Sequence, residues 1–186
     1  MKLEVAMKNE IDVLRDLAGK FTQGNIAYML TGSLAMNYYA QPRMTRDIDV
    51  VVALGSEDVD TVTGLFNPDY YVARESITRA IARESVFNLI HQETVIKVDC
   101  IVRKSHTYRR LEFGRRRLIT IQDFTVWITS KEDLIISKLD WARDSRSEVQ
   151  LRDVRNLLAT GYDAAYLEKL TSELGLYDLW QECLHE

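Results

Sequence analysis

Two aspartates at the start of an apolar run, Asp47 and Asp49, have the residue type and the spacing to bind a metal ion. The run that they open, Asp47-Ile48-Asp49-Val50-Val51-Val52-Ala53, is rich in β-branched residues and predicts a core strand. Because side chains alternate along a strand, both carboxylates lie on one face. Two neighbouring carboxylates repel each other, and a divalent cation keeps both of them ionised. The alternative is a pair of solvated aspartates at a strand edge.

A third carboxylate, Asp99, lies within a second β-branched run, Ile96-Lys97-Val98-Asp99-Cys100-Ile101-Val102. A buried aspartate in the middle of a strand is unfavourable unless it has a partner. If this strand lies beside the first, three carboxylates converge on one point, as they do in two-metal sites for phosphoryl transfer. A two-metal nuclease would use the same three carboxylates.

A turn that could hold phosphate, Thr31-Gly32-Ser33, precedes the aspartate strand. It separates a short apolar run, residues 26–30, from a helix-like run, residues 34–40. Glycine allows a tight turn between strand and helix, and the free amides of the helix start can bind phosphate oxygens together with the Ser33 hydroxyl. The alternative is a simple turn with an N-cap.

Lys138 is unexpected because it falls within the apolar face of a predicted helix, the face on which Trp141 is also expected. A lysine in such a place extends to solvent, pairs with an acid or serves a site. Asp153 has a similar position in the next predicted helix. One interpretation is a Lys138–Asp153 ion pair that joins the two helices. In the other, Lys138 reaches a nucleotide phosphate and Asp153 orients it.

The net charge of −4 argues against a general nucleic-acid coat protein, but it hides a basic segment. From Arg103 to Arg117 the chain has seven Lys and Arg residues against the single Glu112, a local net charge of +6. This segment could bind an anionic partner, such as an RNA or protein acceptor, or form an ordinary solvated surface.

The elements that must position these residues predict an α/β fold, a mixed sheet flanked by helices and followed by a helical tail. The chain has 186 residues, 46% of them hydrophobic, with only two prolines, which suits one globular unit. We place a core at residues 1–129 and a helical subdomain at 130–186. Helices are expected over residues 5–21, 34–40, 56–66, 76–83 and from 130 onward, and strands over 26–30, 47–53, 86–90, 94–102, 118–121 and 124–128.

The sequence also predicts a cytoplasmic protein without a membrane segment. No basic region followed by an apolar region opens the chain, as it would in a signal peptide. The uncharged residues 21–42 are interrupted by turn residues, and the two cysteines, Cys100 and Cys183, are too few for a disulfide framework.

The motifs together resemble the nucleotidyltransferases of the DNA polymerase β-like superfamily. Their order is Thr31-Gly32-Ser33-Leu34, then Arg46-Asp47-Ile48-Asp49, then Val98-Asp99-Cys100. With Lys138 and Arg152-Asp153, the chain looks most similar to minimal bacterial and archaeal members near the AbiEii toxin group. The similarity covers residues 26–102 and, more loosely, continues to residue 158.

The resemblance implies a role for each matching residue. Asp47 and Asp49 would bind Mg²⁺ or Mn²⁺, and Asp99 would complete the metal site or serve as a base. The residues expected to contact the NTP are Thr31, Gly32, Ser33, Arg46, Lys138 and Asp153. Lys138 would also assist catalysis.

The implied reaction is metal-dependent transfer of a nucleoside monophosphate from an NTP to an acceptor, either RNA, a protein or a small molecule. The resemblance extends to a role in a toxin–antitoxin system, with a toxin or antitoxin as partner. The alternative is a non-catalytic protein of the same fold, acting as an antitoxin or a complex subunit.

Overall fold

The centre of the fold is a pair of parallel strands whose side chains alternate between a covered and an open face. The computed structural model describes residues 8–185. β2 (Asp47–Val52) pairs in parallel with β5 (Lys97–Val102). Ile48, Val50 and Val98 are fully buried, whereas the alternate positions, which include the aspartates, are more exposed. Ile48, Val50 and Val98 therefore belong to a covered face, and the acidic residues lie on the opposite one.

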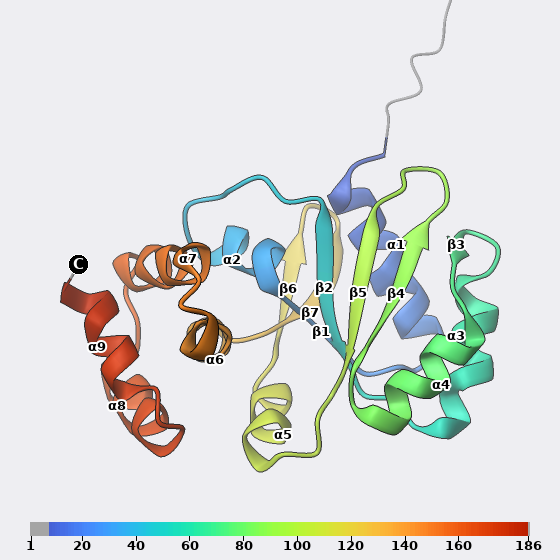
Figure 1. Ribbon diagram of the computed structural model, residues 1–186. Helices are drawn as coiled ribbons and strands as arrows, with labels where there is room; N and C mark the ends of the chain where they lie inside the picture. Colours follow the sequence, from blue (N-terminus) through green and yellow to red (C-terminus); the bar gives the residue numbers. More distant parts are fainter. Residues whose placement is uncertain (1–7, 186) are drawn as a thin grey trace, which may run out of the picture.

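The described strands form one mixed sheet in the order β3-β4-β5-β2-β1-β7-β6 (Figure 1). β1 pairs in parallel with β7 and antiparallel with β2, and the remaining pairs, β3–β4, β4–β5 and β6–β7, are antiparallel. The bounds of the other strands are Tyr28–Thr31 for β1, Tyr70–Tyr71 for β3, Val86–His91 for β4, Arg117–Ile121 for β6 and Phe124–Ile128 for β7.

The helices of the first two thirds of the chain surround this sheet, and in Figure 1 α1 runs behind it. Phe21 of α1 stacks against Tyr28 of β1 and meets Phe66 of α3, so aromatic packing fixes these helices on the strands. The helix bounds are Glu10–Gln23 for α1, Gly32–Tyr39 for α2, Val59–Phe66 for α3, Arg74–Arg83 for α4 and Thr107–Gly114 for α5.

Four helices make up the described tail and lie beside the sheet at the end where α2 is found (Figure 1). Their bounds are Lys131–Ser145 for α6, Glu148–Ala159 for α7, Ala164–Glu173 for α8 and Tyr177–His185 for α9. Buried side chains of the tail and of the sheet belong to one continuous apolar core. Within residues 8–185, no helix is both long and apolar enough to cross a membrane.

The predicted α/β fold with a mixed sheet, flanking helices and a helical tail is confirmed. The antiparallel hairpin of β4 and β5 is also present. The first helix begins at Glu10, where Asn9 caps it, and the predicted start at Val5 lies outside the described residues. The prediction that Trp141 is part of the apolar face is wrong, because 71% of this side chain is exposed.

Candidate active site

The register of three strands brings the predicted acidic residues to one face of the sheet. Asp49 lies opposite Asp99 on β5 and opposite Thr31 on β1. Asp47 lies opposite Lys97, one pleat further toward the start of β2, and is exposed. Neighbouring strands are about 4.8 Å apart, so the carboxyl groups of Asp49 and Asp99 lie side by side on rigid backbone.

Asp49 is a carboxylate whose surroundings disfavour its charged form. Burial raises its pKa, the negative charge of Asp99 raises it further, and Asp47 adds to this effect. A hydrogen bond from the Ser33 backbone amide and the positive charge of Lys138 act in the opposite direction. Since the sum of these effects is a raised pKa, the ionised form of Asp49 gains stability from any further cation that binds beside it.

Lys97 is a site residue that the sequence analysis did not select. Its Nζ lies 3.1 Å from Asp99 Oδ2, while the amide of Asn88 donates to the other oxygen of the Asp99 carboxylate. The hydrogen bond to Asp99 raises the pKa of Lys97 despite partial burial, and the charges of Asp47 and Asp49 contribute. Its position two residues before Asp99 on the same strand is the signal that could have revealed it.

The donor chemistry of this face fits a hard divalent cation. Carboxylate oxygens are the ligands that Mg²⁺ and Mn²⁺ prefer, and Asp47 and Asp49 present two of these groups on one strand. Across residues 8–185, no three His, Cys, Asp or Glu side chains are already arranged as a metal site. Asp99 is held by Lys97 and Asn88 instead, so Asp47 and Asp49 are the carboxylates best placed to take the ion.

The turn at Gly32 requires glycine for two reasons. Its φ is +64°, a left-handed conformation that side chains disfavour, and a Cβ atom there would lie 2.0 Å from Asp49 Oδ2. Thr31 makes no side-chain cap at the start of α2, and the Ser33 amide of the first turn donates to Asp49 instead. The turn is therefore in direct contact with Asp49.

Lys138 is buried and pairs with Asp153, its Nζ lying 2.8 Å from Asp153 Oδ2. This contact joins α6 to α7, as the first interpretation of these residues expected. Burial lowers the pKa of Lys138, and Asp153 offsets part of this effect. Burial works to raise the pKa of Asp153, but hydrogen bonds from Arg43 and Lys138 outweigh it and hold that pKa below its usual value.

Arg43 is the second site residue that the sequence analysis missed. Its guanidinium donates to both oxygens of Asp153 and to the Ser33 hydroxyl, the last over 2.7 Å. Its partner Asp153 is 110 residues away in the chain, so no local pattern marks it. Arg46, which the resemblance selected, is exposed and makes no hydrogen bond or ion pair within the part of the chain that the structure describes.

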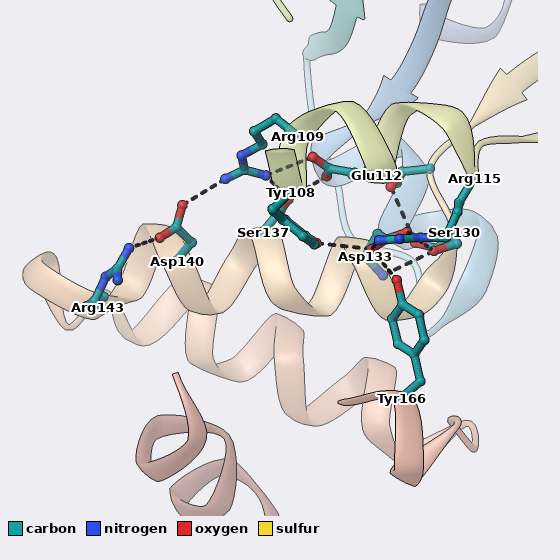
Figure 2. A network of polar contacts seen from close by, with 11 residues as sticks. Tyr108, Arg109, Glu112, Arg115, Ser130, Asp133, Ser137, Asp140, Arg143 and Tyr166 are labelled. Carbon is teal, nitrogen blue, oxygen red and sulfur yellow. Dashed lines mark hydrogen bonds and ion pairs between the residues drawn. The ribbon is translucent and has the colours of Figure 1, made fainter. Parts of the chain in front are cut away.

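Several arginines of the basic segment are used inside the molecule (Figure 2). Arg115 donates two hydrogen bonds to the buried Asp133, and Arg109 contacts Glu112 and Asp140. Arg116 lies over the rings of Phe113 and Trp127. The basic residues of the segment that are exposed are Lys104, Arg110 and Arg117. Only these three keep their side chains free for the acceptor role that the segment was predicted to have.

Comparisons with known proteins identify the fold. No family model and no curated protein matches the chain. The structure is similar to that of the antibiotic-resistance factor ANT(2'')-Ia, with a TM-score of 0.61 and 15% identity over 95% of this chain and 96% of that one. The chain has the nucleotidyltransferase fold.

Two further solved structures share the nucleotidyltransferase fold. A nucleotidyltransferase-like protein from Paracoccidioides brasiliensis matches with a TM-score of 0.57 and 18% identity over 94% of this chain and 92% of that one. The lincosamide antibiotic adenylyltransferase LnuA matches with a TM-score of 0.54 and 15% identity over 80% of this chain and 96% of that one. The fold is therefore present at nearly the full length of each of these proteins.

Proposed function

We propose that the protein is a metal-dependent nucleotidyltransferase that transfers a nucleoside monophosphate from an NTP to an acceptor hydroxyl. The observation that carries the proposal is the contact between the Gly32 turn and Asp49, which itself lies opposite Asp99. Phosphoryl transfer needs groups that bind phosphate beside carboxylates that bind metal, and this contact supports assigning those two roles to the turn and to the carboxylates. The nucleotidyltransferase fold supports the proposal at the level of architecture.

In this reaction the acceptor oxygen forms a bond to the α-phosphorus, the bond from that phosphorus to the bridging oxygen breaks, and pyrophosphate leaves. A divalent cation held by Asp47 and Asp49 would neutralise phosphate charge. Asp99 either completes that site or takes the proton of the acceptor hydroxyl. The Gly32 amide and the Ser33 hydroxyl would bind phosphate oxygens beside Thr31, while the Ser33 amide holds Asp49 in place.

Two cations would complete the binding of the triphosphate. Lys138, oriented by Asp153, would offer its ammonium from the tail side, and its positive charge acts on Asp49. Arg46 is exposed just before Asp47 and would meet the outer phosphates from solvent.

Among the three classes of acceptor, we favour a small molecule. ANT(2'')-Ia, described in complex with adenylyl-2''-tobramycin, and LnuA, described with lincomycin bound, have this fold and act on small antibiotics. In addition, Arg109, Arg115 and Arg116 are engaged within the molecule, which leaves a smaller basic surface for RNA.

The AbiEii-like motifs support a second setting, in which the acceptor is RNA or a protein and the partner is a toxin or antitoxin. Lys104, Arg110 and Arg117 would then form the contact surface. Both settings are compatible with a reducing cytoplasm, since Cys100 and Cys183 are buried and not joined by a disulfide.

The test is release of pyrophosphate from each labelled NTP in the presence of Mg²⁺ and either a panel of aminoglycosides and lincosamides or a cell extract. Asp47→Asn and Asp49→Asn should abolish the release. Asp60→Asn is the matched control. Asp60 has the same spacing from a second aspartate, in the sequence Asp58-Val59-Asp60, but lies outside the site and forms a surface ion pair with Arg74. Turnover by Asp49→Asn at the wild-type rate would refute the mechanism.

A non-catalytic protein of the same fold is the second candidate. It is favoured by the engagement of Asp99 with Lys97 and Asn88, which leaves the three carboxylates short of a complete metal site in residues 8–185. Calorimetry with Mg²⁺ and each NTP separates the two candidates. Absence of heat at millimolar nucleotide would favour the non-catalytic protein.

A further inference from the structure

Arg43 connects the Gly32 turn to the helical tail. The residue lies in the loop between α2 and β2, and one of its terminal nitrogens, Nη2, is 2.7 Å from Ser33 Oγ and 3.0 Å from Asp153 Oδ2. Asp153 is completely buried, whereas 29% of the Arg43 side chain remains exposed. The guanidinium is therefore anchored in the interior and still accessible to a ligand.

The backbone of Arg43 is fixed as well. Its N–H donates to Asn37 Oδ1 over 2.9 Å, and Asn37 Nδ2 donates to its carbonyl oxygen over 2.8 Å. Asn37 belongs to α2, the helix that begins at Gly32. One helix thus carries the turn at its start and holds Arg43 near its end, so the guanidinium and the turn keep a constant geometry. A donor fixed in this way binds a ligand without a further cost of ordering.

The charges around Arg43 leave room for an anion. Arg43 and Lys138 share the single carboxylate of Asp153. The other carboxylate that acts on Lys138 is Asp49, which the proposed function assigns to the metal. Once a divalent cation neutralises Asp49, the two cations exceed Asp153 by one positive charge. This excess lies next to the Ser33 hydroxyl and the uncapped start of α2.

We propose that Arg43 is a further binding residue for the triphosphate, placed by Asp153 and Asn37 to donate to the phosphate group that the Gly32 turn receives. The proposal rests on the proposed function and adds a residue that no sequence motif selected. A guanidinium suits this role because its planar fork can donate to a phosphate oxygen and to Ser33 at the same time. The competing explanation is that Arg43 only neutralises the buried Asp153.

The test is calorimetric titration of the full chain with two probes, inorganic tripolyphosphate and ATP with Mg²⁺. Arg43→Ala should weaken the binding of both probes at least about tenfold, the loss expected for one charge-assisted hydrogen bond. Arg43→Lys should fall between Arg43→Ala and the wild type, because an ammonium lacks the fork. Arg152→Ala is the control, since Arg152 is exposed on the same helix as Asp153 and should change either Kd less than about twofold.

The double variant Arg43→Ala with Asp153→Asn separates binding from neutralisation. It removes one charge of each sign, so the net charge of the site is unchanged and Asp153 is no longer left without its guanidinium. The single variant Asp153→Asn is measured beside it, because this change alone takes the carboxylate partner from the buried Lys138. If Arg43 binds phosphate, the double variant stays at least about tenfold weaker than the wild type. Recovery to the wild-type Kd, or a Kd for Arg43→Ala within about twofold of wild type, would overturn the inference. Failure of the wild type to bind either probe would instead refute the proposed function, and this inference with it.

Discussion

The substitution Asp133→Asn should destabilise the fold strongly, because Asp133 is a fully buried carboxylate that receives hydrogen bonds from four side chains. Arg115 donates to both of its oxygens, over 2.7 and 3.0 Å, and Ser130 donates over 2.7 Å. The hydroxyls of Tyr108 and Tyr166 donate to Oδ1. Figure 2 shows this cluster where α5, α6 and α8 meet.

The expected loss follows from the geometry of the Arg115–Asp133 pair. Removing one partner of a buried ion pair costs about 3–5 kcal/mol. The Arg115 side chain is 32% exposed, so water compensates part of its charge, and we expect the lower end of this range, about 3 kcal/mol. For a chain of this length, that loss lowers Tm by about 6–12 °C. Urea unfolding at pH 7, followed by circular dichroism, measures the free energy, and a thermal scan measures Tm.

The loss of stability caused by Asp133→Asn should also depend on pH. Although burial works to raise it, the pKa of Asp133 is lowered by its hydrogen bonds from Arg115, Ser130 and Tyr166. Its charged form therefore stabilises the fold at pH above about 3.9, the value for an unfolded aspartate, and this contribution is lost as the pH falls through the lower pKa of the folded state. The difference between wild type and Asp133→Asn should be constant from about pH 8 to 5 and shrink below about pH 4.

Asp140→Asn is the matched control on the same helix. Asp140 contacts Arg109 and Arg143, but its side chain is 31% exposed, so its loss should cost less than about 1 kcal/mol. If Asp133→Asn lowers the free energy of unfolding no more than Asp140→Asn does, then burial does not determine how much these ion pairs stabilise the fold, and the reasoning is wrong.

Three further substitutions test separate features. Gly32→Ala should lower the free energy of unfolding, measured in urea, by about 1–2 kcal/mol, because alanine disfavours the left-handed backbone at this position. The new Cβ should also displace Asp49 and abolish pyrophosphate release, and release at the wild-type rate would contradict this. Lys97→Met leaves Asp99 without its cation, so it should lower the Tm measured in EDTA by about 2–4 °C, and adding Mg²⁺ should restore that Tm. Equal Tm values for the variant and the wild type in EDTA would contradict this prediction. Trp141→Ala should change the free energy of unfolding by less than about 0.5 kcal/mol, and a larger loss would mean that the exposed ring has a packing role.

The sequence carried enough information for the strands and the carboxylates that they present. The β-branched runs at residues 47–53 and 94–102 correspond to β2 and β5, and the period of two placed Asp47 and Asp49 on one face. The condition under which Asp99 joins them, that the two strands are neighbours, is met. The turn at Gly32 was recognisable because strand, turn and helix follow each other locally in the chain. Local pattern was sufficient wherever neighbouring residues decide the structure.

Lys97 was missed although its partner Asp99 is only two residues away, whereas the other contacts that sequence reasoning missed join separate segments. Arg43 pairs with Asp153, which is 110 residues away in the chain, and Arg115 pairs with Asp133 only because α5 packs on α6. Trp141 was placed on the wrong side because the apolar face of α6 is defined by the helices that cover it, which bury Lys138 and leave Trp141 outside. No periodicity within one helix contains that information.

The two buried carboxylates of the tail have a consequence for how this fold can be divided. Asp133 of α6 and Asp153 of α7 are each held by an arginine from the preceding part of the chain, Arg115 and Arg43 respectively. A tail from a homologue could replace this one only if it offered an acid at both points, since either arginine would otherwise face an apolar surface without its counter-charge. The tail could therefore be exchanged only with tails that keep an acid at both positions.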